Sequence, residues 1–260
     1  MKTRYKSAMN NRILSAAVIV SALGYFVDVY DLILFSVVRV ASLKDLGLEG
    51  EALITEGVFL LNAQMFGMLL GGILWGVWGD KKGRISVLFG SILMYSVANI
   101  LNAFVETVPQ YAILRFLAGI GLAGELGAGI TLVSESLPKE KRGYGTTLVA
   151  SVGVAGAVAA ALVADLFSWR TSYIVGGVMG LMLLVLRVVV HESGMFKKTK
   201  ETSVKRGNFL MLFKNKGCLK KYIASILVGV PIWYVIGILV TFSPEFGKAL
   251  LMEELPVAGR

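Results

Sequence analysis

The sequence predicts an all-α membrane protein that crosses the bilayer several times. Hydrophobic residues make up 56% of its 260 residues, charged residues make up only 17%, and the mean hydropathy is +0.73. A soluble domain typically carries about 25% charged residues. The apolar residues gather into runs of about twenty residues or more, which is enough to cross about 30 Å of hydrocarbon as a helix. None of these runs alternates as a strand does, and an open sheet would leave backbone groups unsatisfied in lipid.

Seven apolar runs follow one another along the chain. They cover approximately residues 13–38, 53–78, 85–105, 111–133, 144–167, 171–190 and 222–242. The first run follows a basic N-terminal segment, but no small-residue cleavage site comes after it, so we expect a retained helix rather than a signal peptide. We therefore divide the chain into a six-helix transmembrane bundle (1–191), a basic linker (192–221) and a seventh transmembrane helix with its tail (222–260).

Basic residues fall on alternate sides of the predicted spans. They occupy the N-terminal segment, the 81–84 turn, the 139–142 loop and the 191–221 segment, whereas the opposite connections hold only Lys44 and Arg170. Lys and Arg are enriched in cytoplasmic loops, so the pattern predicts a multi-pass protein of the plasma (inner) membrane with a cytoplasmic N-terminus. The net charge of +9 is spread over these short gaps, which favours a role in topology over nucleic-acid binding.

Enzyme chemistry has no support in the sequence. The single Cys218 excludes a disulfide within the chain, and no metal-ligand spacing surrounds His191. There is no phosphate-binding loop and no Ser/His/Asp set in a plausible context. We expect no cofactor and no metal. Three pairs of small residues at helix spacing instead predict close helix packing; they are Gly67/Gly71, Gly72/Gly76 and Gly176/Gly180.

A basic turn separates the second and third runs. Gly76, Asp80, Lys81, Gly83 and Arg84 stand at the spacing G-x-x-x-D-[RK]-x-G-R. In this topological place the turn resembles the signature loop between helices two and three of the major facilitator superfamily.

Further motifs follow in the order of that family. The run from Arg115 to Gly121 resembles its fourth-helix motif R-x-x-x-G-x-G, and the segment from Glu135 to Gly143 resembles the next cytoplasmic loop. His191-Glu192-Ser193 resembles the signature after helix six. The Asp28-Val-Tyr30-Asp31 run and the G-E-L-G run around Glu125 look most like the metabolite–proton and aromatic-acid–proton symporters.

The resemblance implies a fold of twelve helices in two bundles, each a three-plus-three inverted repeat. Two turns at equivalent places show weak sequence similarity of the kind such a repeat would leave: Asp80–Arg84 after the second run and Asp165–Arg170 after the fifth. This chain holds one bundle and the first helix of an incomplete second bundle. We therefore expect a truncated or split gene product, or a fragment. The alternative is a half-transporter that acts with a second half-bundle or as a homodimer.

We single out four ionisable residues inside the predicted spans: Asp28, Asp31, Arg115 and Glu125. Each costs about 2.5–3.5 kcal/mol to insert, which makes it a functional candidate. Asp28 and Asp31 share a helix face about 4.5 Å apart along the axis, so they are candidates for proton coupling. The alternative is hydrogen bonding to neighbouring helices near the membrane interface.

Arg115 and Glu125 are the candidates in the fourth span. The resemblance implies that Arg115 lines the substrate cavity; the alternative is a side chain that snorkels to the outer interface. Glu125 lies roughly 15 Å further along the helix, too far to pair directly with Arg115. Glu125 is either a proton-binding site or a polar contact with another helix.

Six residues near the basic turns form a predicted cytoplasmic gate, in which ion pairs form and break; they are Gly76, Asp80, Gly83, Arg84, Glu135 and Arg142. The alternative is that these charges only fix topology. In all, the sequence predicts a secondary active transporter that symports a small organic anion with protons by alternating access, driven by the proton gradient. A facilitator, an antiporter and a half-bundle without independent transport are the alternatives.

Overall fold

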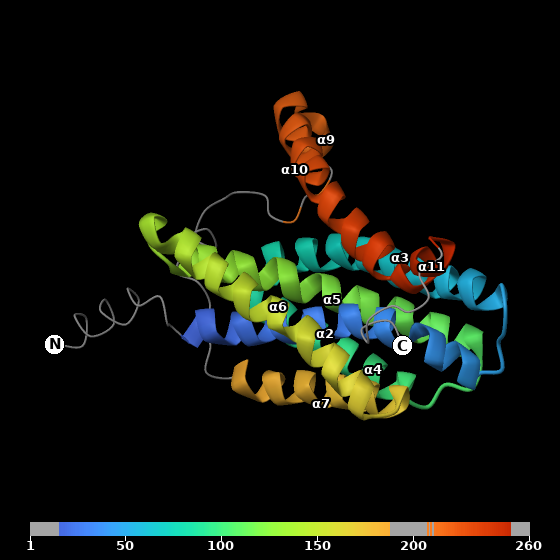
Figure 1. Ribbon diagram of the computed structural model, residues 1–260. Helices are drawn as coiled ribbons and strands as arrows, with labels where there is room; N and C mark the ends of the chain where they lie inside the picture. The colour runs from blue at the N-terminus through green and yellow to red at the C-terminus, as the bar shows by residue number, and fades with distance from the viewer. Residues whose placement is uncertain (1–15, 188–206, 208, 210, 251–260) are drawn as a thin grey trace.

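Seven helices in the computed structural model are long and apolar enough to cross a membrane, which confirms the predicted all-α fold. The structure describes residues 16–187, 207, 209 and 211–250. The first six long helices lie side by side in one elongated bundle (Figure 1). They are α2 (Ala16–Asp45), α3 (Ala52–Lys82), α4 (Arg84–Asn102), α5 (Val108–Ser136), α6 (Arg142–Leu166) and α7 (Trp169–Leu186).

Short elements complete the described chain. The 3₁₀ turn η1 (Lys139–Lys141) precedes α6, and α9 (Met211–Lys214) precedes the seventh long helix, α10 (Lys216–Tyr234). That helix contains Pro231 and continues as a π-helix, η3 (Val235–Val240), before the short α11 (Ser243–Ala249). A proline removes a backbone donor from the helix interior, which accounts for the local change in winding. Most of the predicted linker, with His191, Glu192 and Ser193, lies outside the described residues.

Turn chemistry fixes where the helices begin and end. Gly83 has φ of +104°, a conformation that side chains with a Cβ rarely adopt, and it separates α3 from α4. Thr107 caps α5 by accepting from the backbone N–H of Gln110, and Ser168 caps α7 by accepting from that of Thr171. Most described limits lie within four residues of the predicted ones, but α2 ends seven residues after the predicted 38 and α10 begins six residues before the predicted 222.

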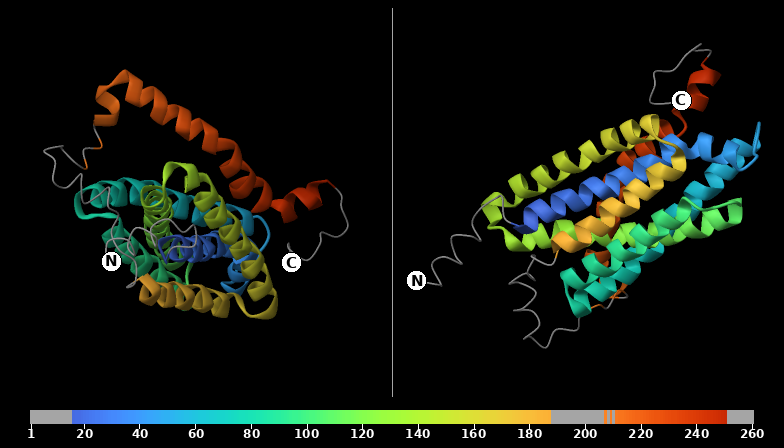
Figure 2. Two further views of the ribbon diagram at one scale, coloured as in Figure 1. Left: turned by 90° about the vertical axis from the view of Figure 1, so that its left-hand side faces the viewer. Right: turned by 90° about the horizontal axis from the view of Figure 1, so that it is seen from below.

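The packing of the bundle follows the pairing of an inverted repeat. α3 packs chiefly against α5, and α6, three helices later, packs chiefly against α2. α4 and α7, the third helices of each half, pack against one another. The left view of Figure 2 shows α10, coloured orange to red, apart from these six helices along much of its length, and none of its residues is buried.

Glycines set the distance between the paired helices. A Cβ at Gly71 would lie 2.7 Å from the Cα of Ile120 in α5, and Gly67 meets the backbone of Phe116 in the same way. Gly176 and Gly180 face Tyr30 and Ser96. Two of the three predicted glycine pairs therefore lie at close contacts. The pair Gly72/Gly76 is different, because a Cβ at either position would meet no described atom within 4 Å.

The end of the bundle where α2 finishes is closed by an aromatic core. The Tyr111 and Tyr173 hydroxyls lie 2.6 Å apart, and the Tyr111 ring stacks on Trp169 with centroids 6.1 Å apart. Beyond them, Arg170 donates to the carbonyls of Ala103 and Val105, at 2.9 Å each. This network ties the connections at that end together.

We expect Gly71→Ala to destabilise the bundle and Gly72→Ala not to. Both changes gain about 1 kcal/mol of helix propensity, but only the first places a Cβ against a rigid backbone, which costs about 1–3 kcal/mol. The measurement is the melting temperature of the purified chain in one detergent. Equal melting temperatures for the two variants would contradict the packing role of Gly71.

Candidate functional site

Six ionisable side chains are buried inside the described bundle. They are Asp28, Asp31, Arg39, Arg115, Glu125 and Arg187, each at most 5% exposed. The four residues predicted from the sequence are all among them. Arg39 and Arg187 were missed. Arg187 lies within the predicted sixth span, so its charge was a usable signal, whereas Arg39 follows directly on the predicted end of the first span.

Asp31 and Arg115 form the central ion pair of the bundle. Their nearest atoms, Oδ1 and Nη1, are 3.5 Å apart, and both side chains are fully buried. Arg115 Nη2 also donates to Oε1 of Gln64 in α3 at 2.5 Å. The guanidinium lies 5.0 Å from the ring centroid of Phe35 and 5.6 Å from that of Tyr173. Arg115 thus points into the bundle and does not snorkel toward its end.

Glu125 pairs with Arg187, which follows the last residue of α7. The pair lies against Gly24 of α2, where a Cβ would fall 2.7 Å from Arg187 Nη2. A glycine at this position therefore leaves room for the two charged groups. Arg115 and Glu125 have different partners, as their predicted separation requires.

Asp28 is the buried carboxylate without a partner. Neither of its oxygens has a hydrogen-bond partner among the described residues. Tyr95 and Asn99 of α4 approach the two aspartates, Tyr95 facing Asp28 and Asn99 facing Asp31. The Tyr95 hydroxyl and the Asn99 amide likewise find no geometric hydrogen bond in this part of the chain. Buried polar groups normally have partners, so these side chains stand out within the described bundle.

The predicted gate residues gather at one end of the bundle, with one exception. Arg84 lies 2.9 Å from Asp80 and 3.6 Å from Glu135, so it joins the α3–α4 turn to the end of α5. Arg142 Nε donates to the carbonyl of Leu137 at 3.2 Å in the adjoining loop. Gly83 supplies the turn itself. Gly76 lies on the open side of α3, where none of the other five contacts it.

A second cluster lies at the opposite end of α2. Arg39 pairs with Glu245 of α11, donates to the carbonyl of Leu53 at 3.3 Å, and lies 4.6 Å from the ring centroid of Phe242. The hydroxyls of Ser36 and Thr241 are 2.8 Å apart. These contacts attach the segment after the seventh long helix to the six-helix bundle.

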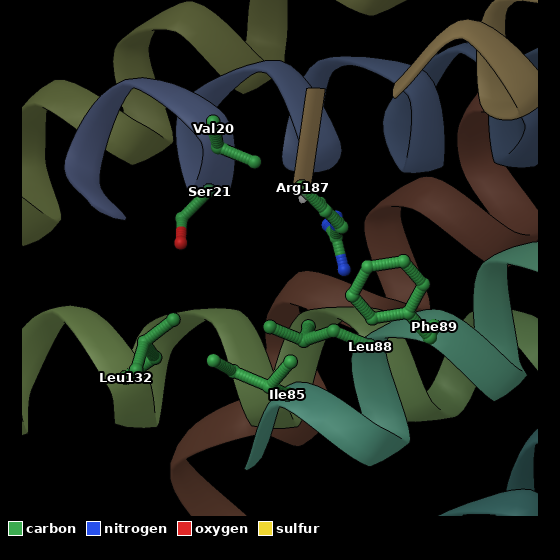
Figure 3. Close-up of a pocket in the computed structure, with 7 residues that line it drawn as sticks. All are labelled: Val20, Ser21, Ile85, Leu88, Phe89, Leu132 and Arg187. Atoms are coloured by element: carbon green, nitrogen blue, oxygen red, sulfur yellow. The ribbon is translucent and has the colours of Figure 1, made fainter. Parts of the chain in front are cut away.

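A small cavity, with room for about one water molecule, lies near the gate end (Figure 3). It is bounded by α2, α4, α5 and the end of α7; its lining residues are Val20, Ser21, Ile85, Leu88, Phe89, Leu132 and Arg187. The walls are apolar except for the Ser21 hydroxyl and the Arg187 guanidinium, which point into the space in Figure 3.

Helices of membrane-spanning length around a core of paired charges define a multi-pass membrane protein built like a solute transporter. The chain belongs to the Major Facilitator Superfamily, whose profile matches residues 14–256. This confirms the family that the motifs around Asp80 and Arg115 predicted.

Curated relatives give the same family at moderate identity. The benzoate transport protein of Acinetobacter baylyi is 31% identical over 199 residues, which are 72% of this chain and 42% of that protein. The niacin transporter of the same organism is 30% identical over 178 residues, covering 67% of this chain and 40% of the relative. These relatives are named as transporters, in agreement with the prediction that the chain is not an enzyme.

Solved structures show the same fold. A D-xylose–proton symporter matches with a TM-score of 0.67 at 19% identity, over 90% of this chain and 62% of that one. A bacterial homologue of the lysosomal transporter Spinster, in an inward-facing state, also matches with a TM-score of 0.67, at 16% identity, over 93% and 56%. The chain spans about half the length of the curated relatives it matches.

Removing one member of the central ion pair should destabilise the bundle more than removing both. Asp31→Asn or Arg115→Gln leaves a buried charge alone, which costs about 3–5 kcal/mol, whereas the double variant leaves no charge. We expect each single variant to melt at a clearly lower temperature than the double variant. Asp80→Asn is the matched control: it breaks a partly exposed pair and should cost less than about 1 kcal/mol. Additive single effects would contradict the pairing.

Proposed function

We propose that the chain provides the first bundle of a secondary active transporter that symports a small organic anion with protons. The observation that supports this best is the buried row of Asp28, Asp31 and Arg115, since charges this costly to bury inside a membrane mark ion and substrate pathways. Asp28 and Asp31 would carry the coupling proton, with Glu125 as a further polar site. Access would alternate by rocking of this bundle against a second one, with the substrate near the midplane.

An aromatic carboxylate is the proposed substrate class. Relatives are named for benzoate and niacin, and others for gentisate and 4-hydroxybenzoate. All four compounds are aromatic acids that are anions at neutral pH. Arg115 would attract such an anion by charge-assisted hydrogen bonding, at the cost of its contact with Asp31. Competition between the two carboxylates for one guanidinium would link substrate binding to the protonation of Asp31.

The Arg84 cluster would act as the cytoplasmic gate. Asp80, Arg84 and Glu135 already meet across two helix ends, and Gly83 gives the turn its shape. Arg142 begins α6 beside this cluster. Gly76 would act through a second bundle on the open side of α3. This assignment places the N-terminus and the basic linker (192–221) in the cytoplasm and the protein in the plasma membrane.

The alternative is a half-transporter that needs a second half-bundle or a second copy of itself. Exposed apolar side chains along α6 favour it, because Val154, Val158 and Leu162 follow one another at helix spacing and are each about 60% exposed. Lipid or another bundle would have to cover this stripe. Domain 222–260 would then be the start of the second bundle.

Uptake into proteoliposomes tests the function. We expect the purified chain to accumulate labelled benzoate or nicotinate when the outside is acidic, and a protonophore to abolish accumulation. Asp31→Asn should reduce uptake at least about tenfold, while Glu106→Gln, an exposed carboxylate in a connection, should leave it unchanged. Uptake that ignores the pH gradient and Asp31→Asn would remove the symport. No uptake by the chain alone would favour the half-transporter.

The proposed orientation can be tested with the single native cysteine, which is exposed at the start of α10. A membrane-impermeant maleimide should label Cys218 only after the cells are permeabilised. A Cys218→Ser, Glu106→Cys variant should show the opposite behaviour, because Glu106 lies in a connection at the other end of the bundle. Labelling of Cys218 in intact cells would reverse the orientation.

A further inference from the structure

We propose that Arg187 is shared between Glu125 and Asp28, and that its movement from one carboxylate to the other transfers a proton in the opposite direction. This relay deepens the proposed proton coupling and rests on it. It assigns a positioning role to Arg187, a residue outside the predicted site.

Each buried arginine of the described bundle has a carboxylate partner, and one buried carboxylate is left over. Asp31 and Arg115 neutralise one another, and so do Glu125 and Arg187. Arg39 pairs with Glu245 at the far end of α2. Asp28 is left with no ion pair and no hydrogen bond from any described residue, at 5% exposure. A buried carboxylate without a partner is more stable as the neutral acid, so Asp28 carries the proton in this conformation.

Arg187 has the donors and the position to reach Asp28. Only its Nη2 is used by Glu125, and its Nε and Nη1 have no hydrogen-bond partner within the described chain. The side chain is 2% exposed, so water at the surface does not replace these contacts. Gly24, which lies against the pair, is one helical turn from Asp28, about 6 Å along α2. Arg187 is also the charged group that acts most strongly on Asp28.

Among the residues that the structure describes, Arg187 is the cation that acts on Asp28. Tyr25 and Asp31 approach it from α2 itself, and Tyr95 approaches it from α4. Glu125 on α5 holds Arg187 from the other side. α6, which packs on the opposite side of α2, has no titratable residue between Tyr144 and Asp165.

The transfer keeps charge and atoms balanced. The O–H bond of the Asp28 acid breaks, and the proton forms an O–H bond on Glu125, directly or through water. The guanidinium leaves Glu125 and pairs with the new Asp28 carboxylate through its unused donors. One proton, one cation and one carboxylate are present before and after the step, so neither state buries an unpaired charge.

The cavity beside Arg187 provides a route by which the proton on Glu125 would leave toward the gate end of the bundle. Its walls include Ser21, about one turn before Gly24, and Ile85, which directly follows Arg84 of the gate turn (Figure 3). A proton on Glu125 is therefore closer to that end of the bundle than a proton on Asp28. Water in the cavity would release it there.

Infrared spectroscopy of the purified chain in phosphatidylcholine vesicles at neutral pH tests the relay through the band of protonated carboxyl groups. The wild-type band should disappear in Asp28→Asn. In Glu125→Gln, Arg187 has only Asp28 to pair with, so we expect Asp28 to ionise and the band to fall at least fivefold. Glu106→Gln is the control and should keep the full band. An unchanged band in Glu125→Gln would show that Arg187 is not shared, and would overturn the proposal.

Arg187→Gln provides a second, opposite readout if Glu125→Gln does not fold. Without the cation, both Asp28 and Glu125 should hold protons, so the band should double, while Arg187→Lys should keep the wild-type intensity. A band that does not grow in Arg187→Gln would equally overturn the relay. The experiment involves no uptake, so a chain that fails to transport, against the proposed function, still gives a clear result here.

Discussion

The bundle depends on placing opposite charges together where water is scarce. A single charge inside a membrane is expensive, and its cost falls when a partner of opposite sign shares the site. Asp31 with Arg115, Glu125 with Arg187, and Arg39 with Glu245 each connect different helices, so every pair also fixes how two helices meet. The same arrangement leaves Asp28 without a partner.

Close helix contact makes this charged interior possible. Gly67 and Gly71 bring α3 onto the backbone of α5, and Gly156 brings α6 onto the backbone of α2 in the same way. Gly153 leaves room for the Tyr25 ring. Because backbones that approach closely exclude lipid, the polar side chains of α4 and α5 lie between walls of protein. Gly24 serves the charges more directly, since it leaves the space that Glu125 and Arg187 occupy. Glycines therefore allow the helices to approach closely and, at Gly24, leave room for a buried ion pair.

The two ends of the bundle are built for different tasks. At one end, Arg84 joins Asp80 and Glu135 through partly exposed ion pairs, which exchange partners at low cost. At the other end, aromatic rings around Tyr111 and the fully buried Arg39 form a denser closure. Asp28 and Arg115 lie between these ends. The two ends of the described bundle therefore differ in how their charges are buried and paired.

The sequence by itself determined the fold class, the family and four of the buried charges. The apolar run length, the basic turns and the Asp80–Arg84 motif depend only on local sequence and on the thickness of the bilayer. Tertiary structure decided which buried charges pair with one another. Arg187 is more than sixty residues from its partner Glu125, and no periodicity in the sequence relates the two. Arg39 was missed because the first predicted span ended at residue 38, its last apolar residue. In the structure α2 continues to Asp45, and the Arg39 side chain is buried. Which carboxylate is left without a cation follows from packing alone, since helix contacts, and not spacing along the chain, decide which charges meet.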